Sequence, residues 1–163
     1  MNKNSLINYE DIVFNDQISE TPNAITYQCT ILPNSDKCTA KIMKNEKQEM
    51  DRKFIEYIDM VKNINHYGII PFVGYCPANK NVMQQNIIIT KYAAFHSLQT
   101  ILDKRSRGDD MQWWSPVNQF IVIYGIAHSM KYLHDSNIVH EKLTPSNILI
   151  DEKTGEVTHV DLG

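Results

Sequence analysis

Apolar and polar positions alternate with a period of two through much of the first half of the chain, a pattern typical of β-strands. It predicts strands over Asp11–Ile18, Ala24–Leu32 and Cys38–Met43. Between the last two strands, Pro33-Asn34-Ser35-Asp36 favours a turn, because proline fixes one backbone angle and short polar side chains bond their own backbone. Residues Ala24–Met43 are therefore expected to form a hairpin.

The period then changes to that of an amphipathic helix, expected over Glu46–Ile64. Its recurring apolar positions are Met50, Phe54, Ile58 and Val61. Two more strands are expected over Ile69–Tyr75 and Asn86–Tyr92, joined by a turn at Cys76–Lys80 in which Pro77 breaks the pattern.

The second half of the chain is more helical. A short helix is expected over Ser97–Lys104, with a polar loop at Arg105–Asp110. Ser115 and Pro116 are a favourable N-cap and first helical residue for a helix that runs to about His134. Its apolar positions are Phe120, Ile123, Ala127 and Met130 on one face, with Ile126 and Leu133 beside it. A last hairpin is expected from strands at Asn147–Ile150 and Val157–Val160, with the turn at Glu152-Lys153-Thr154-Gly155.

Composition narrows the class of protein. The chain has 163 residues, of which 42% are hydrophobic and 21% charged, as in an ordinary soluble domain. The net charge of −3 does not favour nucleic acid or an anionic membrane, and the longest apolar run, Phe120–Ala127, is too short to span a bilayer. Three widely spaced cysteines, Cys29, Cys38 and Cys76, indicate free thiols in a reducing compartment, so a cytoplasmic location is expected and a zinc site is not.

One stretch near the end of the sequence carries a specific motif. Residues His140-Glu141-Lys142-Leu143-Thr144-Pro145-Ser146-Asn147, preceded by Tyr132-Leu133-His134, resemble the H-R-D-L-x-x-x-N catalytic loop of protein kinases. Asp161-Leu162-Gly163 resembles the D-F-G motif, and Cys38-Thr39-Ala40-Lys41 resembles the V-A-I-K strand. The chain is therefore similar to a eukaryotic protein kinase domain of the tyrosine-kinase-like serine/threonine type.

This resemblance implies an α+β, protein-kinase-like fold, with residues 1–163 forming one truncated domain. It implies a five-stranded antiparallel N-lobe sheet with helix C over about residues 9–91, and an incomplete helical C-lobe over residues 92–163. The C-lobe part would contain helices D and E, the catalytic loop and a short hairpin. The sequence ends at the D-F-G-like motif, so the activation segment and the later helices are expected to be missing.

The resemblance assigns cofactor-binding positions for ATP. Lys41 is the expected phosphate-binding lysine, Thr90 the gatekeeper, and Tyr92 the entry to the hinge. In place of the three glycines of G-x-G-x-x-G stand Ser19, Thr21 and Ala24, with Pro22 between them. Because a Cβ at each position and the proline ring restrict the turn, an ordinary connection between two strands is favoured over a phosphate-binding loop.

Lys41 should pair with a glutamate of helix C. The family spacing points to Tyr57, and Glu56 lies one residue early. Because a one-residue slip rotates a helical side chain by about 100°, Glu56 reaches Lys41 only if the helix shifts its register. Otherwise Lys41 is an unpaired strand lysine.

The catalytic loop departs furthest from the kinase pattern. Lys142 replaces the catalytic aspartate, and an ammonium group has no lone pair with which to accept a proton. Glu141 replaces the preceding arginine, and Thr144 replaces the lysine expected in serine/threonine kinases. Ordinary phosphoryl transfer is therefore not expected.

The two expected magnesium ligands are present. Asn147 and Asp161 offer oxygen atoms of the kind that Mg²⁺ prefers, although both residues are equally explained as turn residues at strand ends. In a kinase-like loop Lys142 would lie near both, and one hypothesis is that it neutralises Asp161 in place of the metal. Binding of ATP and Mg²⁺ is then expected to be weak or absent.

Three functional hypotheses follow. The leading one is a pseudokinase-like protein with possible residual ATP binding and a binding or scaffolding role; the alternative is an active ATP-dependent serine/threonine kinase, if the chain is a fragment of a longer product. The third is an interaction module that uses the apolar face of the helix from Ser115 to His134, which corresponds to helix E and would lack its usual cover. A protein partner is expected on that face, and neither nucleic acid nor a membrane.

Overall fold

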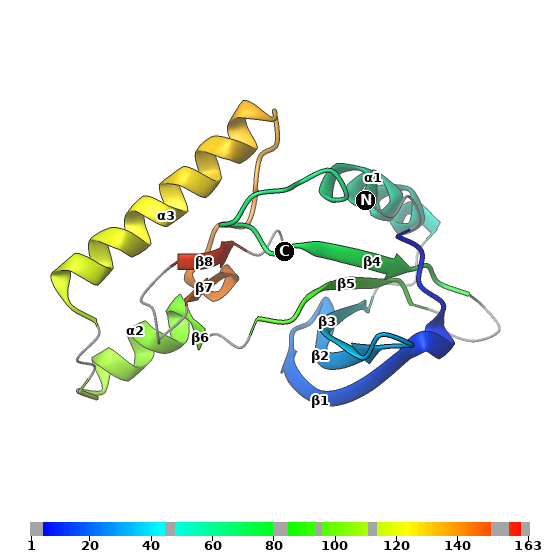
Figure 1. The fold of residues 1–163 in the computed structure, drawn as a ribbon, viewed down its shortest axis with the longest axis horizontal. Helices are drawn as coiled ribbons and strands as arrows, with labels where there is room; N and C mark the ends of the chain where they lie inside the picture. Colours follow the sequence, from blue (N-terminus) through cyan, green and yellow to red (C-terminus); the bar gives the residue numbers. More distant parts are fainter. Residues whose placement is uncertain are drawn as a thin grey trace. The chain divides into compact units, whose positions relative to one another are not determined.

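The computed structural model describes residues 5–44, 48–79, 85–93, 96–110, 114–150 and 157–160. The chain divides into two compact units, the first formed by Met1–Ile64 and Pro71–Tyr92, the second by Asn65–Ile70 and Ala93–Gly163. The first unit is a five-stranded sheet with one helix, and the second is mainly helical with a small sheet (Figure 1). This is the α+β architecture that the sequence predicts.

The first unit is built on an antiparallel sheet with the strand order β1-β2-β3-β5-β4. A short 3-10 turn at Tyr9–Asp11 leads into the first strand. The strands are β1 (Ile12–Glu20), β2 (Ala24–Ile31), β3 (Asp36–Met43), β4 (Phe72–Cys76) and β5 (Ile87–Lys91). The predicted hairpin is confirmed, because β2 and β3 pair from Ala24 opposite Met43 to Ile31 opposite Asp36.

One face of this sheet forms the larger core of the first unit. Its buried side chains are Ile12, Cys29, Cys38, Ala40, Ile42, Cys76, Ile87 and Ile89. All three cysteines are free and buried here. Burial, and secondarily the neighbouring Cys38, raises the pKa of the Cys29 thiol to about 12, so this thiol stays protonated and behaves as a small apolar side chain.

Helix α1 (Gln48–Val61) covers the other face of the sheet. Phe54 and Ile58 form a buried cluster with Ile88 of β5, and Tyr57 packs against it. The helix is as the periodicity predicts, although Glu46 and Lys47 of the predicted range lie outside the described residues, as does Lys80 of the predicted turn. Packing of the apolar stripe on the sheet is what stabilises a helix of this length.

The free edge of β4 is covered by the chain's own N-terminal segment. The Ile7 N–H donates to the Tyr75 carbonyl at 2.9 Å, and the Tyr75 N–H donates to the Ser5 carbonyl at 2.8 Å. Gly74 permits this approach, because a Cβ there would lie 2.5 Å from the Ser5 oxygen. The segment therefore shields backbone groups that would otherwise be open to pairing with another chain.

The second unit contains two helices and a three-stranded sheet. Its elements are β6 (His96–Ser97), α2 (Leu98–Ser106), α3 (Pro116–Asp135), a 3-10 turn at Pro145–Asn147, β7 (Ile148–Ile150) and β8 (Val157–Val160). The small sheet has the order β6-β7-β8. Its core is formed by Ile101, Trp114, Val122, Ile148 and Ile150. The predicted final hairpin is confirmed, while its turn at Glu152–Gly155 lies outside the described residues.

Serine side chains cap both helices of the second unit that the structure describes; the cap at Ser115 is predicted from the sequence, whereas the sequence predicts Ser97 as the first helical residue. The side chain of Ser97 accepts a hydrogen bond from the Thr100 N–H, and that of Ser115 accepts one from the Asn118 N–H. Ser115 and Pro116 therefore begin α3 at the expected position.

Several predicted boundaries are wrong. Helix α1 ends at Val61 and not at Ile64, β1 continues past Ile18 to Glu20, and Cys76 belongs to β4 and not to the predicted turn. Helix α2 continues to Ser106, past the expected end at Lys104, because basic side chains in the last turn favour the helix C-terminus and the Ser106 hydroxyl donates to the Asp103 carbonyl at 2.8 Å. Strand β4 begins at Phe72, because Ile69 belongs to a turn in which its N–H donates to the His66 carbonyl.

Helix α3 buries one face and exposes the other. The buried positions are Val122, Ser129 and Leu133, whereas Phe120 and Ile123 are 69% and 64% exposed. Of the apolar positions identified from the sequence, Phe120, Ile123 and Ala127 therefore point to solvent, Met130 is half-buried, and Ile126 and Leu133 belong to the packed side of the helix. Within the described ranges, no helix is both long enough and apolar enough to cross a membrane.

The turn at Asn65–Ile70 approaches α3 very closely at one glycine. The Ser129 hydroxyl, which is fully buried, contacts the Gly68 carbonyl at 3.0 Å and the Gly125 carbonyl at 2.9 Å. A Cβ on Gly68 would lie 2.2 Å from this hydroxyl oxygen, far inside van der Waals contact. The turn therefore requires glycine at this position.

We expect Gly68→Ala to lower the free energy of unfolding by about 1–3 kcal/mol, the usual cost of overpacking a filled site. Urea unfolding of the full chain measures this loss. Ser129→Ala removes the clashing oxygen, so the double variant should lose less than the sum of the two single variants. Additive losses would show that the contact between these two residues is not the cause.

Candidate active site

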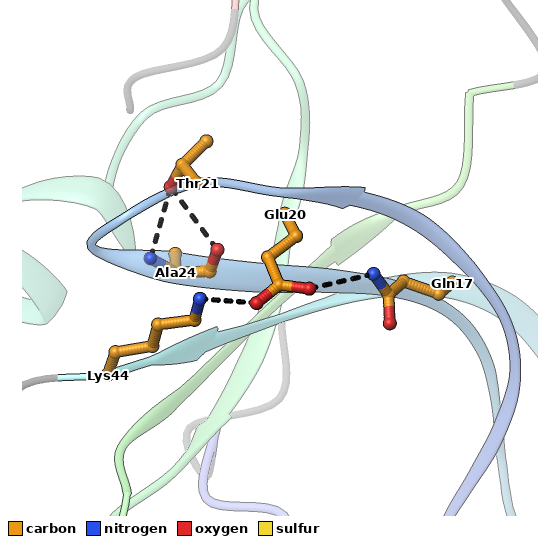
Figure 2. A network of polar contacts seen from close by, with 5 residues as sticks. All are labelled: Gln17, Glu20, Thr21, Ala24 and Lys44. Carbon is orange, nitrogen blue, oxygen red and sulfur yellow. Dashed lines mark hydrogen bonds and ion pairs between the residues drawn. The ribbon is translucent and has the colours of Figure 1, made fainter.

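The connection between β1 and β2, with the strand ends beside it, contains the three positions that the sequence aligns with the glycines of a phosphate-binding loop. The Thr21 N–H donates to the Ala24 carbonyl at 2.8 Å, and the Thr21 hydroxyl contacts both the carbonyl and the N–H of Ala24 at 3.2 and 3.1 Å (Figure 2). Ser19 and Thr21 are exposed, and Ala24 is buried. Thr21 and Ala24 thus close a short turn by hydrogen bonds to each other, while Ser19 lies on β1 opposite Thr26.

This turn is also tied to the end of β3. The Lys44 N–H donates to the Asn23 carbonyl at 2.9 Å, and the Lys44 ammonium lies 2.6 Å from the Glu20 carboxylate. The Gln17 amide donates to the other oxygen of Glu20 at 3.2 Å, and Figure 2 shows the carboxylate held between the two side chains. The hydrogen bond and charge of Lys44 lower the pKa of Glu20, so its carboxylate is ionised at neutral pH and is paired with the Lys44 ammonium.

Sequence reasoning missed the ion pair of Glu20 and Lys44. The residues are separated by 24 positions, and only the strand registers reveal their proximity. Glu20 lies opposite Ile25 at the end of β1, and Ala24 lies opposite Met43, which puts Lys44 beside the turn. A register worked out from the predicted hairpin would have been the signal.

Lys41 lies on β3, with its backbone opposite Thr26 and Ile88, and it is half-buried. Glu56 is exposed on α1 and pairs with Arg52 at 3.1 Å. Among the residues that the structure describes, Glu56 does not pair with Lys41, and Tyr57 packs into the apolar cluster beneath α1. The helix therefore has not shifted to supply the glutamate.

Thr90 and Tyr92 lie at the end of the same sheet. Thr90 is half-buried on β5, opposite Thr39 of β3 and Phe72 of β4. Tyr92 follows the strand, and its N–H donates to the Lys37 carbonyl at 3.3 Å. These two residues and Lys41 are thus ordered on neighbouring strands of the first unit.

The loop that resembles the catalytic loop lies in the second unit. The Lys142 N–H donates to the His140 carbonyl at 2.8 Å, and the Asn147 side-chain amide donates to the Lys142 carbonyl at 2.9 Å. Glu141, between them, has a φ of 63°, a left-handed conformation that costs free energy in a residue with a Cβ. The loop is therefore held in one shape by hydrogen bonds that span it.

The side chains in this loop offer little for metal or proton transfer. Lys142 and Glu141 are exposed. The Asn147 amide nitrogen donates to the Lys142 carbonyl. Among the described residues predicted to bind Mg²⁺, the side-chain oxygen of Asn147 is therefore the one atom that could coordinate the metal. Asp161 lies outside the described residues. Of the two ligands predicted for Mg²⁺, the structure therefore describes only Asn147, with Lys142 exposed in the same loop.

We expect Lys44→Met to raise the pKa of Glu20 toward its ordinary value, because both the hydrogen bond and the opposite charge are removed. Carboxyl ¹³C NMR titration of the full chain measures this pKa. Lys62→Met is the matched control, since Lys62 pairs with Asp59 and not with Glu20. An unchanged Glu20 titration in Lys44→Met would contradict the assigned ion pair.

Comparison with known proteins identifies the family. The family model for protein tyrosine and serine/threonine kinases matches residues 12–163. Similar proteins include the receptor-like serine/threonine-protein kinase NCRK of Arabidopsis thaliana, 27% identical over 64% of this chain and 18% of its own length. Another is the serine/threonine-protein kinase STY17 of the same organism, which is 28% identical over 72% of this chain and 20% of its own length. A third is the dual specificity protein kinase pyk3 of Dictyostelium discoideum, which is 29% identical over 73% of this chain and 8% of its own length.

The chain therefore spans at most 20% of the length of these three relatives. Kinases in general bind ATP together with Mg²⁺. The matched range includes every residue discussed above, from the β1–β2 turn to the loop around Lys142. The chain belongs to the protein tyrosine and serine/threonine kinase family.

Proposed function

We propose that this kinase-family protein is a pseudokinase that lacks phosphotransferase activity and acts through binding. The observation that carries the proposal is Lys142 at the position of the catalytic aspartate, in a loop held in shape by the Asn147–Lys142 hydrogen bond of 2.9 Å. The ammonium group cannot accept the proton of a substrate hydroxyl. A positioned general base typically contributes about 10²–10⁴ to a rate.

The geometry around the nucleotide positions supports the same proposal. The Thr21–Ala24 turn is closed by hydrogen bonds between its own residues, and Pro22 together with the Cβ at each aligned position restricts a close approach to phosphates. Lys41 lacks a pairing with Glu56. Lys41, Thr90 and Tyr92 retain their places on the sheet, so residual ATP binding is proposed to be weak and independent of Mg²⁺.

The alternative is an active ATP-dependent serine/threonine kinase. Its support is membership of the family and similarity to relatives named as serine/threonine kinases. Lys142 distinguishes the two proposals, because an active enzyme would need another acceptor at that place. Among the described residues of the loop, the nearest carboxylate in sequence is Glu141, which is exposed and held in a left-handed conformation.

The binding role is proposed for the exposed face of α3. Val117, Phe120, Ile123 and Tyr124 are each at least 60% exposed. Residues 116–130 include no Asp, Glu, Lys or Arg. This face therefore offers no charged groups for a partner that binds through charge, such as nucleic acid. An uncharged apolar strip meets its own copy without repulsion, and we propose a second copy of this chain as its occupant.

A cytoplasmic location is proposed for the chain. Its support is the state of the three cysteines in the first unit, which are free and buried in one core cluster. Free thiols are typical of compartments kept reducing by glutathione and thioredoxin.

We expect the purified chain to transfer no more ³²P from ATP to itself or to a generic protein substrate than Lys41→Ala does. The reason is that neither protein has a proton acceptor at the position of Lys142. A phosphate-transfer assay in the presence of Mg²⁺ measures the incorporation. Incorporation that is present in the wild type and lost in Lys41→Ala would establish the alternative function.

The thermal midpoint with ATP, measured with and without Mg²⁺, tests the cofactor proposal separately. A small rise that is the same in both conditions is expected, and a large rise that requires Mg²⁺ would contradict it. The two measurements are independent, because a protein can bind nucleotide without transferring phosphate.

We expect the molar mass from size-exclusion chromatography with light scattering to rise with concentration, because apolar α3 faces are buried between two copies. Phe120→Glu should give a monomer at all concentrations, since a carboxylate would be buried without a partner. Leu102→Glu on α2 is the control, because Leu102 is a partly exposed apolar residue that does not belong to the exposed face of α3. A wild-type chain that is monomeric throughout would rule out the second copy as occupant.

A further inference from the structure

A cluster of aromatic and imidazole rings joins the turn at Asn65–Ile70 to α3 in the second unit. The ring of His66 lies 4.5 Å from that of Tyr67, 5.0 Å from that of His128 and 4.7 Å from that of Tyr132, measured between centroids. The Tyr132 hydroxyl accepts the Asn65 N–H at 3.1 Å. The turn is thus attached to α3 by the side chains of two histidines and two tyrosines.

The hydrogen bonds of these rings fix where their protons lie. The Gly68 N–H donates to Nδ1 of His66 at 3.1 Å, so that nitrogen carries no proton. The proton of a neutral His66 is then on Nε2, which lies 3.0 Å from Nδ1 of His128 and donates to it. The Tyr67 hydroxyl lies 3.1 Å from the same Nδ1. The two hydrogen bonds of His66 can both be made only while both imidazoles are neutral, whereas the Tyr67 hydroxyl can either donate to Nδ1 of His128 or accept from it.

The same bonds argue against a metal ion held by these two histidines. A neutral imidazole that binds a metal through Nε2 must carry its proton on Nδ1. In His66 that place is taken by the Gly68 N–H, which would then face another N–H. The close approach of the two rings is therefore a hydrogen bond and not a ligand pair.

We propose that His66, Tyr67 and His128 form a histidine latch, which holds Asn65–Ile70 on α3 while both imidazoles are neutral and releases it when either takes up a proton. Protonation of His66 at Nδ1 sets an N–H against the Gly68 N–H. Protonation of His128 at Nδ1 sets an N–H against the Nε2 proton of His66. In both cases a hydrogen bond between the turn and α3, or within the turn, is replaced by repulsion.

Burial, and secondarily the neighbouring His128, lowers the pKa of His66 from its ordinary value of 6.5. A lowered pKa means that the folded protein favours the neutral ring more than the unfolded chain does. The resulting stabilisation is fully present above pH 6.5 and is lost as the pH falls through and below that value.

No carboxylate contributes to the lowered pKa of His66, which is caused first by burial and then by His128. On α3, the charged residues nearest to His128 in sequence are Lys131 and Asp135, which pair with each other at 2.5 Å. His134 is exposed on the last turn of α3, and the remaining groups packed against the rings are the phenols of Tyr67, Tyr124 and Tyr132.

The test follows the thermal midpoint of the full chain between about pH 8 and about pH 5, the range in which histidine titrates. A fall of several degrees is expected for the wild type. His128→Asn should show a smaller fall, because an asparagine oxygen near the place of Nδ1 accepts the His66 proton and cannot titrate. His134→Asn, which removes an exposed histidine of the same helix, should behave as the wild type does.

The latch is overturned if the thermal midpoint of His128→Asn falls as far as that of the wild type and of the control His134→Asn. It is also overturned if the thermal midpoint of the wild type does not change with pH. Should His128→Asn fail to fold, imidazole ¹⁵N NMR of the wild type decides the question. An unprotonated Nδ1 is expected on both His66 and His128 at neutral pH, with the His66 titration midpoint below 6.5. A protonated Nδ1 on His66 would contradict the proposal.

Discussion

The eight-residue ladder between β2 and β3 is the constraint on which most of the first unit depends. It pairs Ala24 with Met43 and Cys29 with Cys38, and so directs Cys29, Cys38 and Ala40 into the core. The side chain of Lys41 then belongs to the opposite face, because neighbouring residues of a strand alternate. A slip of one residue would exchange the two faces and bury the lysine. The kinase-like placement of Lys41 is thus a consequence of core packing and needs no nucleotide.

The same register explains why the β1–β2 connection is short. Because the ladder ends at Ala24 opposite Met43, the chain beyond it meets Lys44, whose N–H reaches the Asn23 carbonyl. A glycine-rich loop could bend away from this point toward a ligand, whereas Pro22 and the threonine bonds keep the turn compact. The loss of glycine removes a flexible cradle and leaves a stable turn in its place.

The sequence predicts those parts of the fold that follow from local pattern. The hairpin at Ala24–Met43 is confirmed because its alternation is regular, and α3 begins at Ser115 and Pro116 because capping is a local effect. Strand β6 escapes prediction, since two residues have no period and pair only because β7 lies beside them. The site is predictable as a set of positions, such as Lys41 and Lys142, whereas the Glu20–Lys44 ion pair joins residues 24 positions apart and depends on the register of the strands.

In the loop that resembles the kinase catalytic loop, the conformation and the charge depend on different residues. Asn147 holds the loop by donating to the Lys142 carbonyl, a bond to the backbone that any residue at position 142 can accept. The loop can therefore keep its conformation whichever side chain stands at position 142. The charges at the two places are balanced differently, because the Glu20 carboxylate beside the turn is paired with the Lys44 ammonium, whereas Lys142 is an exposed cation in the loop. The turn is set apart from a glycine-rich loop by its closing hydrogen bonds and by Pro22, and the loop around Lys142 is set apart from a kinase catalytic loop by the charge at position 142.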